Sequence, residues 1–456
     1  MRRRYQVLAL VVGLAMLAAA CGDSGGDTAS TTSAAEGTAT TATTAATTTT
    51  GGDSGSTATT GGDAAMVQTP CGEGTGEEAT GEPIVVGAVV GATGPADFSS
   101  ASRSAAAYFK CVNANGGING RPVEYLVKDD GWDPEAASTA ARELVEDKNV
   151  VAMIASTSFV ECGVNAQYYE DQNVAVIAGV GVPRECFFSR NIAPTNEGPR
   201  LSGIGAAQFA LEQNPDMKTL ACLANSIPNF GGWVCEGVTA WGKANGVEVS
   251  TYLSAPDGSD LETVVLQAIG DDPDAAVTID PAPAMIGYLK IAEQQQDDRP
   301  WYGATSAYDL AFPDAVGPYW VGKYHAEIEL SPLDSTGPDN TNWIALMDEY
   351  GNSDDPRDSF SQAGFVAAKI FVDTLKGMDP ANITRETVTP ALIGVQDFET
   401  DILCRPWYFG EADQHNANHT GRVVELTDEG IGWKTVKDCF DIEDPELDPI
   451  YAAEGS

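Results

Sequence analysis

Short apolar runs alternate with amphipathic segments along most of the chain beyond residue 83. Residues 84–90 form a continuous apolar run, which is typical of a parallel strand buried on both faces. Residues 101–113 follow a helical period and end before Asn115-Gly116-Gly117, a helix-stop signal. Asp133 followed by Pro134 predicts a helix start, because aspartate caps the free N–H groups and proline is tolerated in the first turn.

The same alternation continues through the middle of the chain. Further strands are predicted at residues 123–128, 150–154, 174–178, 219–224, 247–253, 275–279 and 301–303. Helices are predicted at residues 133–147, 162–171, 200–213, 233–244, 261–269 and 284–294. Repeated β-α-β units predict an α/β fold with doubly wound, mostly parallel sheets. Because so many elements exceed one comfortable sheet, we expect two Rossmann-like lobes.

The N-terminus has a different pattern. Arg2, Arg3 and Arg4 precede an apolar run at residues 7–20 that ends in three alanines. The run has 14 residues, whereas a membrane-spanning helix needs about 20. The pattern is typical of a secretory signal peptide at residues 1–20, with Cys21 directly after it. No other segment is apolar over a length that could span a membrane.

A low-complexity segment follows Cys21. Residues 22–65 consist almost entirely of Thr, Ala, Gly, Ser and Asp and contain no aromatic, Leu, Ile, Val, Lys or Arg. Such a composition cannot bury enough apolar surface to offset the entropy of ordering. We therefore expect a disordered tether over residues 21–82, with a root-mean-square reach of roughly 35–40 Å for its low-complexity part.

Charge narrows the possible partners. Of 456 residues, 66 are acidic and 25 are basic, which gives a net charge of −41. Nucleic-acid binding through phosphate contacts needs a basic face, so we expect no nucleic-acid partner. Docking on anionic lipid through a polybasic patch is excluded for the same reason.

Cysteine spacing favours an oxidising compartment. Eight cysteines follow Cys21, and none is spaced as C-x-x-C, so a zinc or redox site is not indicated. Eight cysteines allow 105 pairings, so the connectivity stays open. Proximity in the sequence favours the pairs Cys71–Cys111, Cys162–Cys186, Cys222–Cys235 and Cys404–Cys439.

Three motifs in order carry a family resemblance. They are VGAVVGATGP at residues 86–95, NANGGING at residues 113–120 and DDGWDP at residues 129–134. Together they resemble the type I periplasmic binding proteins of ABC importers, in the leucine/isoleucine/valine- and amide-binding branch. The residues before Cys21 resemble the bacterial lipoprotein signal, although Ala18 stands where that family usually has Leu.

The resemblance implies how the chain is organised. Lobe 1 would comprise residues 83–196 with 327–422, and lobe 2 residues 197–326 with 423–456. Crossovers between the lobes are expected near residues 194–198, 324–330 and 421–426. The implied protein is a solute-binding lipoprotein, anchored through an acylated Cys21 on the outer face of the cell membrane. Its partners would be an ABC permease with cytoplasmic ATPases, and no cofactor is implied.

In the implied family, the loop after the third strand grips a ligand carboxylate with a serine hydroxyl and a helix N-terminus. An ungapped alignment puts Phe159 at the gripping position, and a one-residue shift puts Ser158 there. Alternatively, Ser158 only caps the following helix. This comparison makes the residues of two loops candidates for ligand contact. The first loop comprises Ser156, Thr157, Ser158 and Phe159. The second comprises Val180, Gly181 and Val182, and the family threonine falls on Val182.

The family glutamate that holds a ligand ammonium is missing. The aligned position falls near Thr305 and Ser306, which carry no carboxylate. Burying a ligand ammonium without a charged partner would cost several kcal/mol. The candidate replacements are Asp97, Asp309 and above all Asp280, which alternatively forms a turn before Pro281. We therefore expect a small organic solute that is less amino-acid-like than leucine. Further lining candidates are Phe98, Trp132, Phe230, Ser306 and Tyr308.

Other function classes find little support. The chain lacks a catalytic set, with no G-x-S-x-G elbow, Walker loop or HExxH motif. His415 and His419 lack the glutamate of the zinc-protease motif, so no metal site is predicted. We predict no enzyme activity. A lipid-anchored sensor that signals to a membrane receptor or kinase remains the alternative to an importer subunit.

Overall fold

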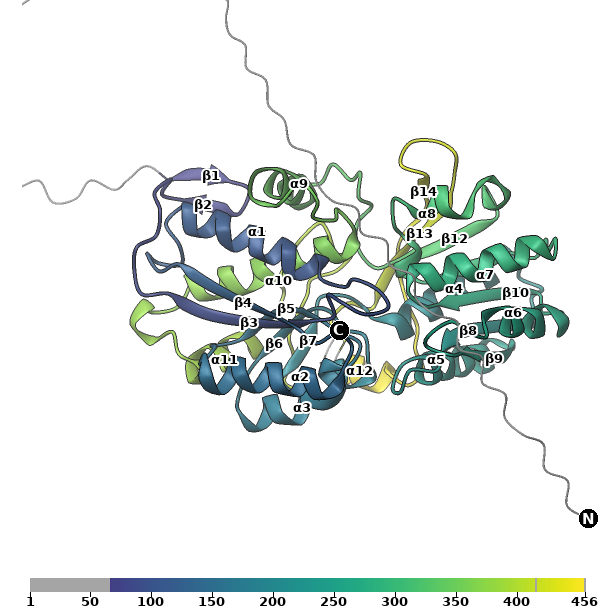
Figure 1. The fold of residues 1–456 in the computed structure, drawn as a ribbon, viewed down its shortest axis with the longest axis horizontal. Helices are drawn as coiled ribbons and strands as arrows, with labels where there is room; N and C mark the ends of the chain where they lie inside the picture. The colour runs from purple at the N-terminus through teal and green to yellow at the C-terminus, as the bar shows by residue number, and fades with distance from the viewer. Residues whose placement is uncertain (1–65, 415, 455–456) are drawn as a thin grey trace, which may run out of the picture. The chain divides into compact units, whose positions relative to one another are not determined.

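Two β-sheets organise the part of the chain that the computed structural model describes, residues 66–414 and 416–454. The first sheet has five parallel strands in the order β4-β3-β5-β6-β7 (Figure 1). Its strands are β3 (Ile84–Val90), β4 (Val123–Asp129), β5 (Met153–Thr157), β6 (Val176–Val180) and β7 (Ile192–Pro194). Strands β5 and β6 are buried throughout, because helices cover both faces of the sheet.

The second sheet has seven strands in the order β14-β13-β12-β11-β10-β8-β9. Its strands are β8 (Thr219–Asn225), β9 (Glu248–Ser254), β10 (Ala275–Ile279), β11 (Trp301–Gly303), β12 (Tyr324–Ile328), β13 (Thr420–Leu426) and β14 (Trp433–Asp441). The first five run parallel, and β13 and β14 extend the β12 edge as an antiparallel pair.

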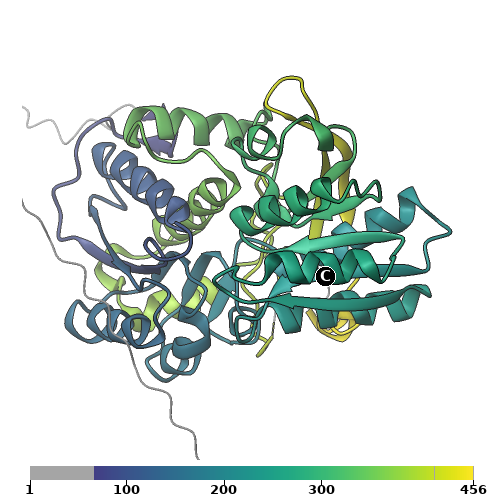
Figure 2. The same cartoon turned by 45° about the vertical axis from the view of Figure 1, so that its right-hand side comes forward.

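Helices lie on both faces of each sheet (Figures 1 and 2). Helices α1 and α10 cover one face of the five-stranded sheet, and α2 and α3 lie on the other. Helices α4 and α5 pack on one face of the seven-stranded sheet, and α6 and α7 lie together on the opposite face. Their bounds are α1 (Ser100–Ala114), α2 (Pro134–Arg142), α3 (Glu161–Asp171), α4 (Pro199–Gln213), α5 (Gly231–Asn245), α6 (Leu261–Gly270), α7 (Ala282–Gln294), α8 (Phe312–Val316), α9 (Pro338–Tyr350), α10 (Ser359–Lys376), α11 (Arg385–Ile393) and α12 (Asp448–Glu454).

The two sheets repeat one winding order. In each, the second strand along the chain lies outside the first, and the third, fourth and fifth follow on the other side. The winding direction therefore reverses between β3 and β5 and again between β8 and β10. This confirms the predicted α/β fold with two doubly wound lobes, and ligands of such sheets bind beyond the carboxyl ends of the strands at the reversal.

The chain passes between the sheets three times. Thr195 to Gly198 lead from β7 to α4, residues 329–337 lead from β12 to α9, and residues 416–419 lead into β13. The expected crossovers at residues 324–330 and 421–426 were placed too far into the second sheet, because β12 and β13 occupy most of those positions. The exact lobe boundaries remain a prediction.

Side-chain amides join the crossovers. Asn416 Nδ2 donates to the carbonyl of Glu197 at 2.7 Å, and Asn418 Nδ2 donates to the carbonyl of Glu329 at 3.2 Å. The side chains of Glu197, Glu329 and the nearby Glu327 are all buried. Burial raises the pKa of Glu327 to about 8 and that of Glu329 to about 7, and it raises the pKa of Glu197 as well.

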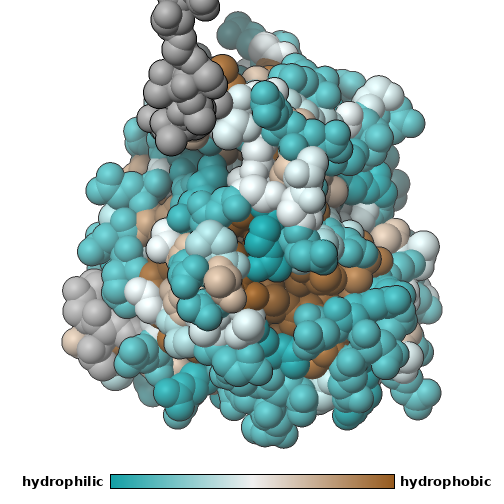
Figure 3. Space-filling model, turned by 90° about the vertical axis from the view of Figure 1, so that its left-hand side faces the viewer, coloured by the Kyte–Doolittle hydropathy of each residue, from teal (hydrophilic) through white to brown (hydrophobic). Residues whose placement is uncertain are grey.

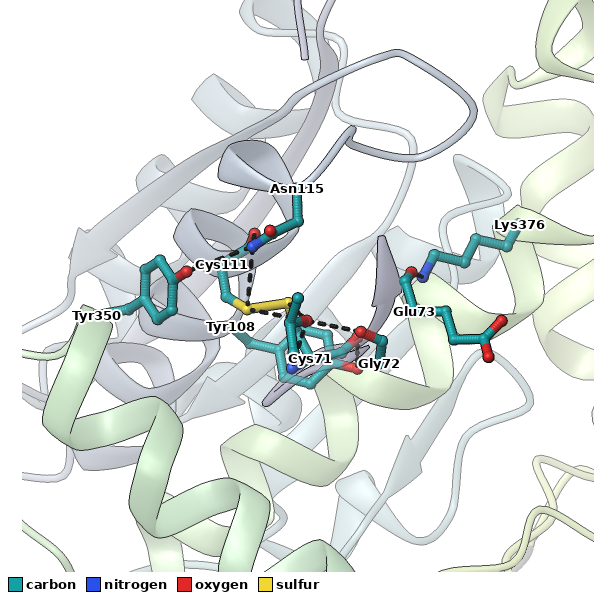
Figure 4. The surroundings of a disulfide bond; sticks show 9 residues. Cys71, Gly72, Glu73, Tyr108, Cys111, Asn115, Tyr350 and Lys376 are labelled. Carbon is teal, nitrogen blue, oxygen red and sulfur yellow. Dashed lines mark hydrogen bonds between the residues drawn. A yellow bond between two sulfur atoms is a disulfide. The ribbon is translucent and has the colours of Figure 1, made fainter. Parts of the chain in front are cut away.

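A hairpin of β1 (Val67–Thr69) and β2 (Gly72–Gly74) precedes the first sheet. A disulfide joins Cys71 in this hairpin to Cys111 on α1 (Figure 4). Tyr108 donates a hydrogen bond to the carbonyl of Cys71, and Lys376 donates one to the carbonyl of Glu73. The tether prediction is therefore wrong for residues 66–82, because a disulfide to α1 and hydrogen bonds from α1 and α10 to its backbone carbonyls hold the hairpin in place. The predicted signal peptide, Cys21 and the remainder of the tether lie outside the described residues.

The structure pairs the remaining cysteines as proximity in the sequence favours. Besides Cys71–Cys111, disulfides join Cys162 to Cys186, Cys222 to Cys235 and Cys404 to Cys439. The Cys222–Cys235 bridge joins two elements that follow one another along the chain, β8 and α5. The Cys404–Cys439 bridge joins the segment before β13 to the end of β14.

Two local predictions needed correction. The strand predicted at residues 150–154 begins at Met153, because the N–H of Val150 still bonds back to the carbonyl of Leu144. The helix predicted at residues 133–147 ends its α-helical part at Arg142 and continues as a π-helical turn to Asp147. Elsewhere the predicted elements lie within three residues of the observed ones.

Hydrophilic side chains dominate the face that Figure 3 shows, although a broad apolar area lies low on it. A mostly hydrophilic surface is expected for a chain with a net charge of −41. None of the helices between residues 66 and 454 that the structure describes combines the length and apolar character required to cross a membrane.

Candidate functional site

An apolar cavity lies at the carboxyl ends of strands from both sheets. Phe159 follows β5, Val182 follows β6, and Pro281 follows β10, so the reversal points of both sheets contribute to the wall. The cavity has a volume of about 40 Å³ in this structure. Its lining comprises Phe98, Phe159, Val180, Gly181, Val182, Asn196, Pro199, Phe230, Ile279, Asp280, Pro281, Ala304, Thr305, Ser306 and Phe360.

Four phenylalanines from separate segments make most of the aromatic wall. Phe98 precedes α1, Phe159 precedes α3, Phe230 precedes α5, and Phe360 lies in the first turn of α10. Phe159 packs edge-on against Phe98 and Phe230 with ring centroids 5.0 and 5.3 Å apart, and Phe98 stacks on Phe360 at 5.5 Å. Offset and edge-to-face contacts of this kind are the arrangements that aromatic rings favour. We call the cavity that these four rings and the other lining residues surround the phenylalanine chamber.

A second, outer cavity continues from the chamber. It shares Phe98, Pro281, Thr305, Ser306 and Phe360 with the chamber. The polar side chains that it adds are Asp97, Tyr308, Asp309, Asp358 and Ser359. We call this outer region the acidic mouth, because its lining contains three carboxylates and no basic side chain.

Asp280 places one carboxyl group in the chamber wall. It is 2 % exposed, and its oxygens accept hydrogen bonds from Asn225 Nδ2 at 2.5 Å and from the Tyr288 hydroxyl at 2.7 Å. Burial raises the pKa of Asp280 to about 7, and these two donors only partly offset that effect. Each carboxylate oxygen has a second lone pair, so the group can still accept a hydrogen bond from a ligand.

The loop after β5 satisfies its own polar groups. Ser158 Oγ donates to Asp130 Oδ2 at 2.5 Å and accepts from the N–H groups of Val160 and Glu161 at 3.0 Å each. Ser156 Oγ accepts from the N–H of Val89. Ser158 thus satisfies the N–H groups of Val160 and Glu161 at the start of α3, although the N-cap position itself is Val160 and Ser158 lies before it.

Most of the predicted site residues come together at the two cavities. The chamber brings together Phe98, Phe159, Val180, Gly181, Val182, Phe230, Asp280 and Ser306, and Tyr308 lines the mouth. Four predicted residues line neither cavity: Trp132, Ser156, Thr157 and Ser158. Trp132 instead stacks behind Phe159 with ring centroids 4.3 Å apart.

Sequence reasoning missed Phe360 and Thr305 as separate lining residues. Phe360 lies far along the chain from the other phenylalanines, and only the packing of α10 on α1 brings it to Phe98. At the neighbouring position, the prediction chose Ser306 and not Thr305. The Ser306 hydroxyl, however, is already engaged, because it donates a hydrogen bond to the carbonyl of Asp280 at 2.6 Å. The sequence signal that was available is the helix start at Asp358, whose side chain accepts a hydrogen bond from the N–H of Ser361. That start places Phe360 in the first turn of α10.

The described residues contain no group of three or more His, Cys, Asp or Glu side chains arranged to hold a metal ion. His419 is described and His415 is not. Burial lowers the pKa of His419 to about 4, and its ring stacks on Tyr451.

Comparisons with known proteins agree with this architecture. The family described as periplasmic binding protein matches residues 83–430. A fatty acid ABC transporter substrate-binding protein from Thermomonospora curvata superposes with a TM-score of 0.70 at 21 % identity, over 83 % of this chain and 98 % of that one. A branched-chain amino acid ABC transporter protein from Thermus thermophilus with bound valine gives 0.70 at 16 % identity, over 79 % and 97 %.

A possible leucine/isoleucine/valine-binding protein from Rhodopirellula baltica gives a TM-score of 0.66 at 15 % identity, over 79 % of this chain and 98 % of that one. Because the sequence identities are this low, the structural similarity shows that these proteins share a fold with this chain. No curated protein matches the chain.

Proposed function

The chain belongs to the periplasmic binding protein family, and we propose that it is the solute-binding lipoprotein of an ABC importer. The observation that carries this proposal is the cavity between the carboxyl ends of two doubly wound sheets, with walls contributed by both. A ligand in that position touches both lobes at once. Of the solved structures named above, the one from Thermomonospora curvata is a fatty acid ABC transporter substrate-binding protein, and the one from Rhodopirellula baltica is a possible leucine/isoleucine/valine-binding protein.

Binding would work through closure of the lobes. A ligand that contacts both lobes stabilises the closed arrangement by its differential affinity for the closed and open states. Moving a population from 1:99 to 99:1 takes about 5.5 kcal/mol of such preference. The three crossovers would act as the hinge, and the permease would recognise the closed form. Nothing in this cycle requires a chemical step on the solute.

The proposal includes a lipid anchor at Cys21. Signal cleavage after Ala20 and acylation of Cys21 would hold the protein on the outer face of the cell membrane. The tether would then let the folded part reach a membrane partner. Four disulfides in the described residues support an extracytoplasmic, oxidising location.

The chamber favours a small organic solute that is not an α-amino acid. Amino-acid recognition needs a carboxylate grip and an ammonium partner, and the Ser158 hydroxyl is already engaged by Asp130 and by the N–H groups of Val160 and Glu161. Aromatic and aliphatic side chains make up most of the chamber lining, so apolar contact supplies most of the binding energy.

The test is native mass spectrometry of the full secreted protein, followed by small-angle scattering with each solute that co-purifies. We expect a non-covalently held solute of low mass and a smaller radius of gyration when it is bound. An unchanged radius of gyration with a saturating solute, or a covalently altered product, would contradict the proposal. Calorimetric titration with leucine, valine and phenylalanine tests the solute class, and tight binding of any of them would contradict that part.

Transport and sensing are separated by a second measurement. Vesicles that contain the cognate permease and ATPases should take up the co-purified solute only when the binding protein is present. Binding and closure without uptake, together with activation of a membrane kinase, would instead support the sensor.

A further inference from the structure

We propose that the solute is an organic cation, with an apolar body in the phenylalanine chamber and a protonated amine facing Asp280 and the acidic mouth. This inference rests on the proposed function and specifies the substrate class of the same site. It follows from the charges that line the two cavities, from an unpartnered hydroxyl where they meet, and from the aromatic wall.

The charges that face the ligand space have one sign. The described residues that line the chamber and mouth include the carboxylates Asp97, Asp280, Asp309 and Asp358 and no Lys, Arg or His. Arg103 forms an ion pair with Asp97, at 2.9 Å. In the described part of the chain, Asp280, Asp309 and Asp358 take part in no ion pair. An anionic solute would therefore meet uncompensated carboxylates, whereas a cation would supply the missing counter-charge.

Thr305 provides an independent indication of a ligand. It is 7 % exposed, it lines both cavities, and its Oγ1 has no hydrogen-bond partner. A buried hydroxyl without a partner costs free energy, so native proteins leave few of them. A hydroxyl can accept a hydrogen bond from an ammonium group, and at this junction that ammonium would also lie between Asp280 and the mouth.

The aromatic wall suits the same ligand. Ring faces attract cations, most strongly when water is excluded, and they bind an apolar body without specific hydrogen bonds. Phe98 and Phe360 stand at the junction of chamber and mouth, where the amine would join its apolar body. A neutral solute would make the same apolar contacts but would gain no attraction to the ionised form of Asp280.

Binding of a cation should also release a proton near neutral pH. Burial raises the pKa of Asp280 to about 7, so the empty site is partly protonated at pH 7. A bound ammonium would favour the ionised carboxylate and expel that proton. A neutral solute would leave the proton in place.

The experiment compares three ligands of one shape: phenethylamine, phenethyl alcohol and phenylacetate. Titration calorimetry of the full protein at pH 7 should rank the amine tightest, about tenfold or more above the alcohol, with phenylacetate weakest. Titrations in two buffers of different ionisation enthalpy should report proton release for the amine and none for the alcohol. Tighter binding of phenylacetate, or of a fatty acid such as decanoate, would overturn the inference.

Variants separate the charge effect from folding. Asp280→Asn keeps the shape of the side chain and should lower amine affinity about tenfold, while alcohol affinity changes less than about twofold. Asp309→Asn, at the mouth, tests the same point without touching a buried group and should weaken the amine several-fold. The matched control is Glu248→Gln, an exposed charge at the amino end of β9, away from the carboxyl-end cleft. Equal losses for amine and alcohol in both aspartate variants would overturn the inference.

Failure of this inference is distinguishable from failure of the proposed function. If none of the three ligands binds, the solute that co-purifies decides: an amine supports the inference, and an acid or a neutral compound overturns it. In both cases closure of the lobes on that solute leaves the proposed function intact. Absence of closure with any solute would overturn both.

Discussion

The hydroxyl of Ser158 donates a 2.5 Å hydrogen bond to Asp130 Oδ2, and both side chains are buried. Ser158 Oγ also accepts from two N–H groups at the start of α3. Ser158→Ala should therefore act on stability, with a loss of about 1–3 kcal/mol, because it leaves the buried Asp130 carboxyl and two N–H groups without this partner. Urea unfolding measures this loss.

Calorimetry with the co-purified solute provides the control for Ser158→Ala. We expect the affinity to change less than about threefold, because Ser158 lines neither cavity. A large loss of affinity with unchanged unfolding would show that Ser158 is a ligand contact.

The C-terminal segment is held by a buried ion pair. Arg200 Nε lies 2.6 Å from Asp444 Oδ2, and these side chains are 4 % and 0 % exposed. Asp444→Ala should destabilise the protein by about 3–5 kcal/mol, because it leaves a buried guanidinium without its main partner. Glu446→Ala is the matched control, since Glu446 pairs with the same arginine but is 62 % exposed. Its expected cost is about 0–1 kcal/mol, and equal costs for the two variants would contradict this assignment.

The disulfides should differ in what they contribute. Cys71–Cys111 spans 40 residues and Cys222–Cys235 spans 13. In the chain-entropy account, replacing both cysteines by serine costs about 4 kcal/mol for the longer loop and about 3 kcal/mol for the shorter one. Chemical unfolding of the two double variants measures the order. Retention of full stability without Cys71–Cys111 would mean that the β1–β2 hairpin adds nothing to the fold.

The buried glutamates at the crossovers predict a pH dependence. The pKa of Glu327 is raised to about 8 and that of Glu329 to about 7, from 4.5 for an exposed glutamate. The folded state therefore keeps protons that the unfolded chain releases, so stability falls as pH rises from about 4.5 to 8. Burial also raises the pKa of Glu161 to about 8, which acts in the same direction. His419 acts oppositely, but only below its unfolded pKa of 6.5.

The range between pH 6.5 and 8 lies above the titration of His419, and Asp280, whose pKa is raised to about 7, acts there in the same direction as the glutamates. We expect Tm to fall by about 2–5 °C across this range. Glu327→Gln and Glu329→Gln should flatten the slope, because neutral amides do not titrate. A Tm that rises across the range in the parent protein would contradict the assignment.

Phe360 is predicted to be a major contact of the chamber. Phe360→Ala should weaken binding of the co-purified solute by about tenfold to a hundredfold, as expected from the loss of 1.5–3 kcal/mol of apolar contact. The side chain is only half-buried, so folding should survive the substitution. Phe360→Leu is the control and should keep most of the affinity. Equal affinity for the parent and Phe360→Ala would remove Phe360 from the site.

Local signals located most of the helices and strands. The apolar run at β3, the Asp133-Pro134 helix start and the small distances between paired cysteines each depend on neighbours in the sequence. Boundaries were less certain where two local tendencies compete, as at β5, where apolar residues begin before the hydrogen-bonded ladder does. The first disulfide showed that the fold begins before residue 83, which composition alone did not reveal.

The site was only partly predictable. Loops that follow strands could be placed at one end of each sheet, which brought Phe159, Val182 and Asp280 into the prediction. Nothing local indicated that Ser158 turns away to Asp130, or that α10 delivers Phe360 to Phe98. Such contacts depend on how distant elements pack.

By itself, the amino-acid sequence determined the alternation of strands and helices, the acidic charge and the family, because each is written in local pattern and composition. Only the tertiary structure decided which side chains face the cavity and which satisfy one another. A hydrogen bond such as Ser158 to Asp130, or a stack such as Phe98 on Phe360, requires two segments to meet in space. That meeting is set by the packing of helices on both sheets, which no single stretch of sequence contains.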